Sequence, residues 1–135
     1  MNPDRVPARF DPADLRHVQT LDDIRALAPD ADGVLVHALT DAKLAAIAEQ
    51  VPGLRHLMTD GRAQVTDGGL QAIRLLNRLE SLDLEWSRVT DGGLPLIAAA
   101  SSLRWVDLGF CEGVSAHGLA ELRGIRPDLE VVDTA

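Results

Sequence analysis

The stretch LESLDLEWSRVTDGGLPLI, residues 79–97, decides the fold. The last two leucines of its LESLDL part are two residues apart, so their side chains point to one face of a short strand. Thr90 stands where a helix N-cap is wanted, and Asp91 follows near the positive end of the helix dipole. Leu94 and Ile97 are three residues apart and share one helical face. We therefore predict a strand followed by a helix, each with one apolar side.

The same two strings recur in phase along the chain. Strand-type strings, separated by 23, 25, 24 and 26 residues, begin at Ala31, Leu54, Leu79, Leu103 and Leu129. Helix-type strings begin at Leu39, Val65, Val89 and Val114. One such unit cannot bury its apolar side alone, whereas stacked neighbours bury it continuously. The repeat predicts an α/β fold with a curved parallel sheet on the concave side and helices on the convex side.

Residues 79–97 and the stretch LRWVDLGFCEGVSAHGL, residues 103–119, resemble the leucine-rich repeat family. The similarity is closest to its bacterial LxLxxTxVTDxGL type and to cysteine-containing, ribonuclease-inhibitor-like repeats, whose inward cysteine corresponds to Cys111. The resemblance covers residues 31–135 and implies a short leucine-rich repeat solenoid of about four repeats plus a final strand. Because the family's shared trait is to bind other proteins through an open curved face, it also implies a non-catalytic protein–protein interaction module.

Residues 1–30 match the repeat poorly, and we predict that they form an N-terminal helical cap on the first edge of the sheet. The Asp-Pro pair at residues 11–12 is typical of a helix start. Apolar side chains continue at helical spacing over residues 15–27, and a proline then ends the run. The expected organisation is therefore a cap followed by repeats at residues 31–135.

Composition narrows the classes of partner. Hydrophobic residues make up 46% and charged residues 25% of the 135, as in an average soluble domain. No apolar run approaches the roughly 20 residues of a membrane-spanning helix, so we expect no membrane partner. With 21 acidic against 13 basic residues the net charge is −8, and the lack of a basic stripe argues against nucleic acid. The single cysteine cannot form an intrachain disulfide, which makes the cytoplasm the expected location.

Three rows of side chains are expected on the concave face, because neighbouring parallel strands lie about 4.8 Å apart. The first row is Gly33, His56, Ser81, Trp105 and Val131. The middle row is Leu35, Met58, Asp83, Asp107 and Asp133. The third row is His37, Asp60, Glu85 and Gly109.

The rows concentrate negative charge on one face, with a tryptophan among the carboxylates. A tryptophan inside a charged patch is typical of an interface anchor. We predict that this acidic concave face binds a protein, with a basic one favoured by charge. The predicted contact residues are Met58, Asp60, Asp83, Glu85, Trp105, Asp107 and Asp133. The alternative is that the aspartates are solvated strand positions without a binding role.

Two aromatic residues, Trp86 and Phe110, follow successive strands at the same offset, and we expect both to pack in the core or the loops; the alternative is contact with a partner. Arg62 and Arg88 lie on the same rim, where they are able to pair with the acidic face. Such surface pairs contribute little to stability.

Other functions stay open. The chain's last strand-type string has no helix after it, and an open strand edge invites pairing with another chain. We therefore keep, as an alternative, a structural or assembly subunit, or a homodimer, docked through this edge.

The third row has metal-ligand types, but nothing in the sequence supplies a second shell, so we expect no metal. The Gly-Gly pairs at residues 68–69 and 92–93 lack the Lys-Ser/Thr of a phosphate-binding loop and are interpreted as room for tight loop-to-helix packing. The sequence contains no recognisable pair of a nucleophile and a general base, so we expect neither an enzyme nor a cofactor.

Overall fold

The computed structural model describes residues 11–133. Within them the chain has an α/β fold whose all-parallel, six-stranded open sheet has the order β1-β2-β3-β4-β5-β6. The strands are β1 (Arg16–Val18), β2 (Gly33–His37), β3 (His56–Asp60), β4 (Ser81–Asp83), β5 (Trp105–Asp107) and β6 (Glu130–Val132). The α-helices are α1 (Leu21–Arg25), α2 (Asp41–Gln50), α3 (Asp67–Leu70), α4 (Leu94–Ala99) and α5 (Ala116–Ile125). Shorter 3₁₀ segments are η2 (Pro12–Asp14), η3 (Gln71–Leu75) and η4 (Asp91–Gly93).

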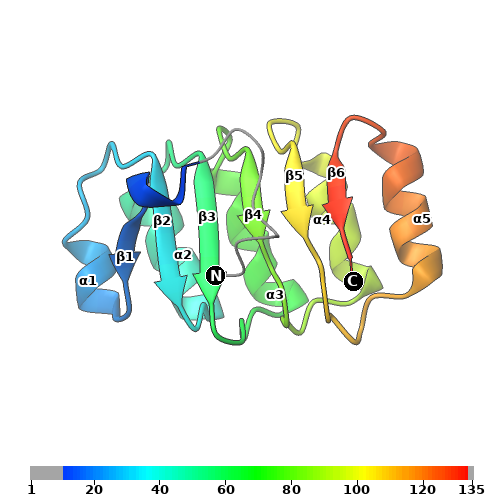
Figure 1. Ribbon diagram of the computed structural model, residues 1–135, viewed down its shortest axis with the longest axis horizontal. Helices are drawn as coiled ribbons and strands as arrows, with labels where there is room; N and C mark the ends of the chain where they lie inside the picture. The colour runs from blue at the N-terminus through cyan, green and yellow to red at the C-terminus, as the bar shows by residue number, and fades with distance from the viewer. Residues whose placement is uncertain (1–10, 134–135) are drawn as a thin grey trace.

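The main core lies between the sheet and the helices, which lie behind the sheet in Figure 1. Leu82 of β4 and Ile97 of α4 are fully buried in it. Thr90 is the N-cap of η4, and its hydroxyl accepts a hydrogen bond from the N–H of Gly92 at 3.1 Å. The strand and helix predicted for residues 79–97 are confirmed, with one 3₁₀ turn at the start of the helix. The side of the sheet opposite these helices, which faces the viewer in Figure 1, is called the open face below.

A carboxylate of each unit is hydrogen-bonded to the N-cap residue of the next. The Asp67 carboxylate accepts bonds from both the backbone N–H and the hydroxyl of Thr90. The same two bonds join the pairs Asp41–Thr66 and Asp91–Ser115. Because a carboxylate that accepts hydrogen bonds holds its proton less tightly, the bonds from Ser115 lower the pKa of Asp91. We call these three pairs the carboxylate clamps.

The clamps explain a glycine in three of the four helix-type strings. A Cβ added at Gly93 would lie 2.5 Å from Oδ1 of Asp67, closer than atoms in contact allow. The corresponding distances from an added Cβ to Oδ1 of the aspartate are 1.8 Å for Gly69 and Asp41, and 2.3 Å for Gly118 and Asp91. These glycines therefore make room for the carboxylate of the preceding unit.

The helical expectation for residues 15–27 is wrong over β1. Arg16–Val18 form a strand that pairs in parallel with residues 34–36 of β2. Val18 is buried in the main core, whereas Leu15 belongs to an apolar cluster on the open face. A separation of three residues places side chains on one face of a helix but on opposite faces of a strand, which is why the spacing misled. A helix does form at α1, where Thr20 is the N-cap.

The last strand is shifted by one residue from the predicted rows. Trp105 pairs with Glu130, and Asp107 pairs with Val132. Placing Val131 in the first row and Asp133 in the middle row was therefore wrong. The sequence interval to this string is 26 residues, whereas the sheet pairs β5 with β6 at an offset of 25. The extra residue is taken up before β6, and this turns Val131 toward the main core.

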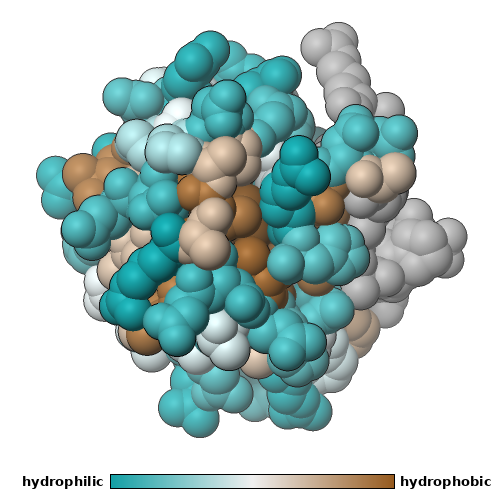
Figure 2. Space-filling view, turned by 90° about the vertical axis from the view of Figure 1, so that its left-hand side faces the viewer, coloured by the Kyte–Doolittle hydropathy of each residue, from teal (hydrophilic) through white to brown (hydrophobic). Residues whose placement is uncertain are grey.

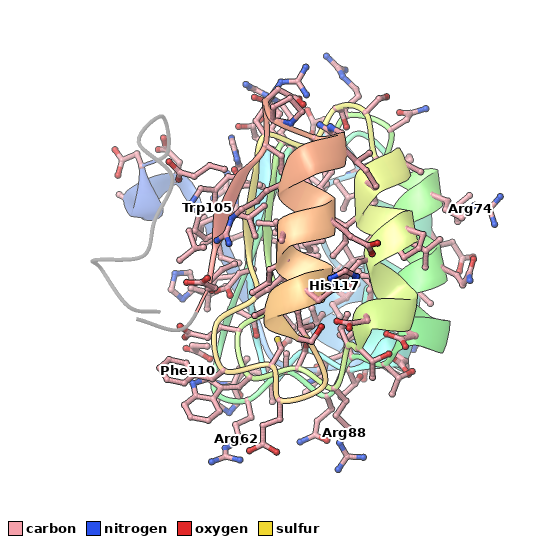
Figure 3. The ribbon with its side chains drawn as sticks, turned by 90° about the vertical axis from the view of Figure 1, so that its right-hand side faces the viewer. Arg62, Arg74, Arg88, Trp105, Phe110 and His117 are labelled. Atoms are coloured by element: carbon pink, nitrogen blue, oxygen red, sulfur yellow. The ribbon has the colours of Figure 1, made fainter. Side chains whose placement is uncertain are left out.

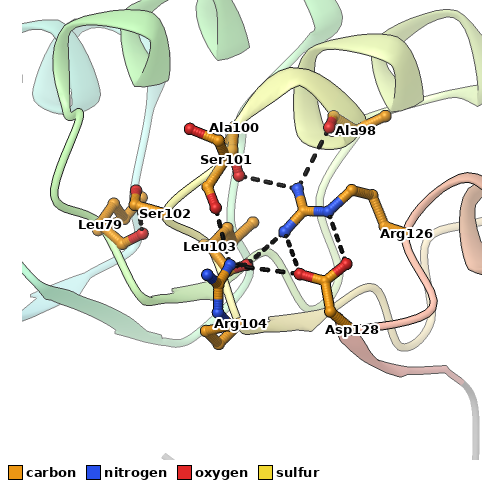
Figure 4. Close-up of polar contacts among 9 residues, drawn as sticks. All are labelled: Leu79, Ala98, Ala100, Ser101, Ser102, Leu103, Arg104, Arg126 and Asp128. Carbon is orange, nitrogen blue, oxygen red and sulfur yellow. Dashed lines mark hydrogen bonds and ion pairs between the residues drawn. The ribbon is translucent and has the colours of Figure 1, made fainter.

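Arg126, which follows α5, ties the last unit to the one before it (Figure 4). Its guanidinium donates to the carbonyls of Ala98 at 3.2 Å, Ala100 at 2.9 Å and Leu103 at 2.7 Å. It also forms a bidentate salt bridge with the carboxylate of Asp128. A helix leaves its last carbonyls without intrahelical partners, and Arg126 bonds such groups at the end of α4.

We expect Arg126→Ala to lower the free energy of unfolding by about 2–3 kcal/mol, because it leaves three part-buried carbonyls without their charged donor. Arg126→Lys should recover part of the loss, since an ammonium cannot reach all three carbonyls as a planar guanidinium does. Urea unfolding measures both variants. Arg78→Ala, at an exposed arginine, is the control and should change stability by less than about 0.5 kcal/mol. An equally small effect for Arg126→Ala would mean that water replaces the guanidinium.

Candidate functional site

The centre of the predicted binding surface is buried. Exposure is 0% for Met58, 1% for Asp107, 4% for Trp105 and 5% for Asp83, so these four of the predicted contact residues are buried in this structure. Met58 and Trp105 pack with Leu15 and other apolar side chains in a second cluster on the open face. In Figure 1 the segment η2, which leads into Leu15, crosses in front of the sheet.

The two buried aspartates bond to backbone rather than to solvent. Oδ1 of Asp83 accepts a hydrogen bond from the N–H of Glu85 at 3.0 Å, and Oδ1 of Asp107 accepts one from Gly109 at 2.8 Å. These bonds hold the chain where it leaves β4 and β5. Burial raises the pKa of Asp83 to about 7, against the effect of its hydrogen bonds. The aspartates are thus structural groups, and they are not solvated as the alternative reading expected.

His56 and Ser81, which sequence reasoning did not pair, are joined on the open face. Nδ1 of His56 lies 2.9 Å from Oγ of Ser81. Their shared place in the first row, on adjacent strands, was the signal that could have found the pair. Burial lowers the pKa of His56, which favours the neutral imidazole. Because Ser81 is only 2% exposed, this arrangement does not present its hydroxyl to a substrate.

The third row is joined only in part. Nδ1 of His37 lies 2.7 Å from Oδ1 of Asp60, and both side chains are partly exposed. Glu85 lies on the same rim and is half-buried. Among residues 11–133, no group of three or more His, Cys, Asp or Glu side chains is arranged to hold a metal ion.

Among residues 11–133, the most exposed aromatic side chains lie where the chain turns after a strand. Ala38, Gly61, Trp86 and Phe110 occupy equivalent places after successive strands, and all four have a left-handed backbone, with φ of 51°, 69°, 65° and 57°. Glycine adopts this conformation without steric cost, whereas a bulky side chain is strained there. The fold therefore holds two large aromatic side chains on strained backbone at its rim.

These two rings pack on each other, as the sequence had led us to expect of loop residues. The ring centroids of Trp86 and Phe110 are 4.3 Å apart, with an interplanar angle of 8°. Trp86 is still 37% exposed. The guanidinium of Arg62 lies 4.8 Å from the Trp86 ring centroid, in a cation–π contact, instead of pairing with the acidic face.

A cleft of about 360 Å³ opens beside this stack, and we call it the rim cleft. It is lined by Arg62, Ala63, Gln64, Trp86, Ser87, Arg88, Phe110, Glu112 and Gly113. Figure 3 shows Arg62, Arg88 and Phe110 together at the lower end of the molecule, with both arginines extended away from the body. Cys111 is buried beneath, where its thiol donates to the carbonyl of Leu84 at 3.1 Å and lies 3.3 Å from Oγ of Ser87.

The two ends of the sheet differ. At β6, Arg123 donates to the carbonyl of Val131 at 3.0 Å and pairs with Asp133 at 3.2 Å. The carbonyl of the next residue, Val132, accepts a hydrogen bond from the N–H of Leu108, which follows β5. Because successive carbonyls of a strand point in opposite directions, the Val131 carbonyl points to the outer edge, where Arg123 donates to it. At the other end, Figure 2 shows a hydrophobic centre ringed by hydrophilic residues, in the region of β1 and α1. A groove there is lined by Val18 and Leu27 among polar side chains.

No protein-family model matches the chain, and a search of curated proteins finds no match. None of the helices within residues 11–133 has the length and apolar character needed to cross a bilayer.

Proposed function

We propose that the chain is a leucine-rich repeat solenoid that acts as a non-catalytic protein-binding module in the cytoplasm, and that it binds its partner at the rim cleft. The observation that carries the proposal is Trp86: a large aromatic side chain, 37% exposed, on left-handed backbone, between Phe110 and Arg62. Tryptophan and arginine dominate binding hot spots. A strained, exposed aromatic stack adds nothing evident to the core, whereas it supplies a rigid contact surface.

The proposed surface differs from the acidic face expected from the sequence. Asp60 and Glu85 are half-buried on the same rim but do not line the rim cleft, and Met58, Asp83, Trp105 and Asp107 are not accessible. Docking through the C-terminal strand edge, by a second copy or an assembly partner, remains an alternative. The contact between Arg123 and Val131 works against it, because that edge carbonyl already has a donor.

We expect a random dodecapeptide display library, selected on the immobilised protein, to yield peptides that lose binding to Trp86→Gly. Glycine suits the left-handed backbone at this position, as Gly61 shows at the equivalent place, so the variant should remain folded. Removal of a central aromatic anchor should weaken binding tenfold or more, on the order of 2 kcal/mol. Fluorescence anisotropy with the selected peptides measures the dissociation constants.

The matched control is Leu75→Ala, which truncates a 63% exposed side chain on η3, away from the rim cleft. It should bind the selected peptides as the wild type does. Peptides that respond to Leu75→Ala but not to Trp86→Gly would move the binding surface to the helices. A selection that yields no peptide sensitive to Trp86→Gly would contradict the proposal.

A further inference from the structure

The two arginines of the rim cleft differ from most others in their pairing. Within residues 11–133, Arg55, Arg104, Arg123 and Arg126 form salt bridges, together with Arg25. No described carboxylate lies within salt-bridge distance of Arg62 or Arg88. In a chain with 21 acidic and 13 basic residues, two guanidiniums that line one cleft without a carboxylate partner among residues 11–133 form a local site for anions.

The cation–π contact prepares Arg62 for a particular kind of anion. Its guanidinium lies over the ring of Trp86, 4.8 Å from the centroid. The ring accepts no conventional hydrogen bond, so the guanidinium keeps N–H groups that can donate two parallel hydrogen bonds to one carboxylate. The ring also limits the conformations of the arginine, so less entropy is lost when an anion binds.

From this arrangement we infer that the rim cleft recognises an acidic peptide segment of a protein partner. Its Asp or Glu carboxylates are held by Arg62 and Arg88, and a neighbouring apolar side chain lies against Trp86 and Phe110. The inference rests on the proposed function and names the partner's chemistry. Glu112 also lines the cleft, and the chain has a net charge of −8. Both features disfavour a polyphosphate backbone relative to a peptide with a few carboxylates.

The test compares two fluorescein-labelled peptides, GSEEFEEGS and its amide counterpart GSQQFQQGS, by anisotropy. We expect the acidic peptide to bind about tenfold more tightly, the difference that one or two charge-assisted hydrogen bonds supply. Arg62→Gln and Arg88→Gln should each remove most of that difference. Glu112→Gln should raise affinity for the acidic peptide about two- to threefold, because it removes a like charge from the cleft.

The matched control is Arg74→Gln, an exposed arginine on the helix side of the molecule in Figure 3. It removes the same charge at a distance and should leave both affinities unchanged. Two-dimensional ¹H–¹⁵N spectra locate the contact: the indole N–H signal of Trp86 should shift on titration with GSEEFEEGS, and that of buried Trp105 should not.

Several results would overturn the inference. These are equal affinity for the two peptides, no binding of the acidic peptide at about 1 mM, an equal loss in Arg74→Gln, or tighter, Arg62-dependent binding of a nine-residue oligothymidylate. The display selection separates this failure from failure of the proposed function. Selected peptides that need Trp86 but are not enriched in Asp or Glu would uphold protein binding and reject the acidic partner.

Discussion

Gly93→Ala is expected to destabilise the protein by about 2 kcal/mol, whereas the same change in an Asp67→Ala background should be neutral or stabilising. The new methyl group would lie 2.5 Å from Oδ1 of Asp67, so the carboxylate must leave the clamp that it forms with Thr90. Loss of charge-assisted hydrogen bonds and residual strain each cost on the order of 1–2 kcal/mol.

The sign change follows from the backbone. Gly93 has φ of −88° and ψ of −15°, a right-handed helical conformation in which alanine is favoured over glycine. Once the Asp67 side chain is truncated, the remaining neighbour within the tight range is a methyl group of Val89 at 3.1 Å. Alanine should then gain up to about 1 kcal/mol, because it has less conformational freedom to lose on folding.

Urea unfolding of the wild type, both single variants and the double variant completes the cycle. The coupling energy should be about 2 kcal/mol or more, in the favourable direction. Gly124→Ala, in α5 with no atom within 4 Å of the added Cβ, is the control and should stabilise the protein by about 0.5–1 kcal/mol. Additive effects of Gly93→Ala and Asp67→Ala would show that the carboxylate is not what excludes a side chain.

The clamps illustrate what the repeat made predictable. The apolar spacing and the threonine caps are local signals, and they correctly placed β4 and α4 and capped the helical segment at Thr90. Room for tight packing was also predicted for the Gly-Gly pairs. The reason for that room was not, because the atom that needs it, Oδ1 of Asp67, belongs to the preceding unit. A sequence pattern shows that a position recurs, but the contact across units appears only when the units are stacked.

The predictions that differ from the structure depend on contacts between distant parts of the chain. Leu15 and Val18 fit a helix by spacing, yet pairing with β2 outweighed that local preference and placed them on opposite faces of the sheet. The repeat also predicts which side chains point to the face of the sheet opposite the helices. It does not predict whether other residues cover these side chains. Leu15 reaches the open face from outside the repeat, and its burial with Met58 and Trp105 removed the centre of the expected site.

The rim shows which part of its geometry the sequence indicated and which part it did not. Trp86 and Phe110 stand at the same offset after successive strands, so their side chains had to meet. Spacing alone does not show that this position is left-handed, because the residues there are alanine, glycine, tryptophan and phenylalanine. Only one of these four favours such a backbone. Once the geometry is known, the cost of holding two rings there becomes the argument for a binding role.

Ionisation of Asp83 is expected to cost the protein about 3 kcal/mol of stability between pH 5 and pH 8, and this loss should appear as the difference between the wild-type and Asp83→Asn profiles. Burial raises the pKa of Asp83 from an ordinary value of 3.8 to about 7, with the neighbouring carboxylates of Asp107 and Glu85 adding to the rise. Between these two values the folded state holds a proton that the unfolded state has released. The unfolded state then binds fewer protons, so the free energy of unfolding falls as pH rises, by up to about 1.4 kcal/mol per unit.

Asparagine imitates the protonated acid and does not titrate. Its carbonyl can keep the 3.0 Å bond from the N–H of Glu85, but its amide group cannot accept the 3.4 Å bond from Thr59. Asp83→Asn should therefore match the wild type near pH 5 to within about 1 kcal/mol and exceed its stability at pH 8. Glu49→Gln, at an exposed position of α2, is the control for loss of a carboxylate and should leave the pH profile unchanged.

Urea unfolding at half-unit intervals from pH 5 to pH 8 gives the profile of each protein. A wild-type profile that runs parallel to the Asp83→Asn profile would show that Asp83 ionises in the folded state as it does in water. That result would mean that the open face admits solvent at β4, so that Asp83 would be available to a partner after all. The experiment thus decides whether Asp83 is buried on the open face, as in the structure, or solvent-exposed on an acidic concave surface, as predicted from the sequence.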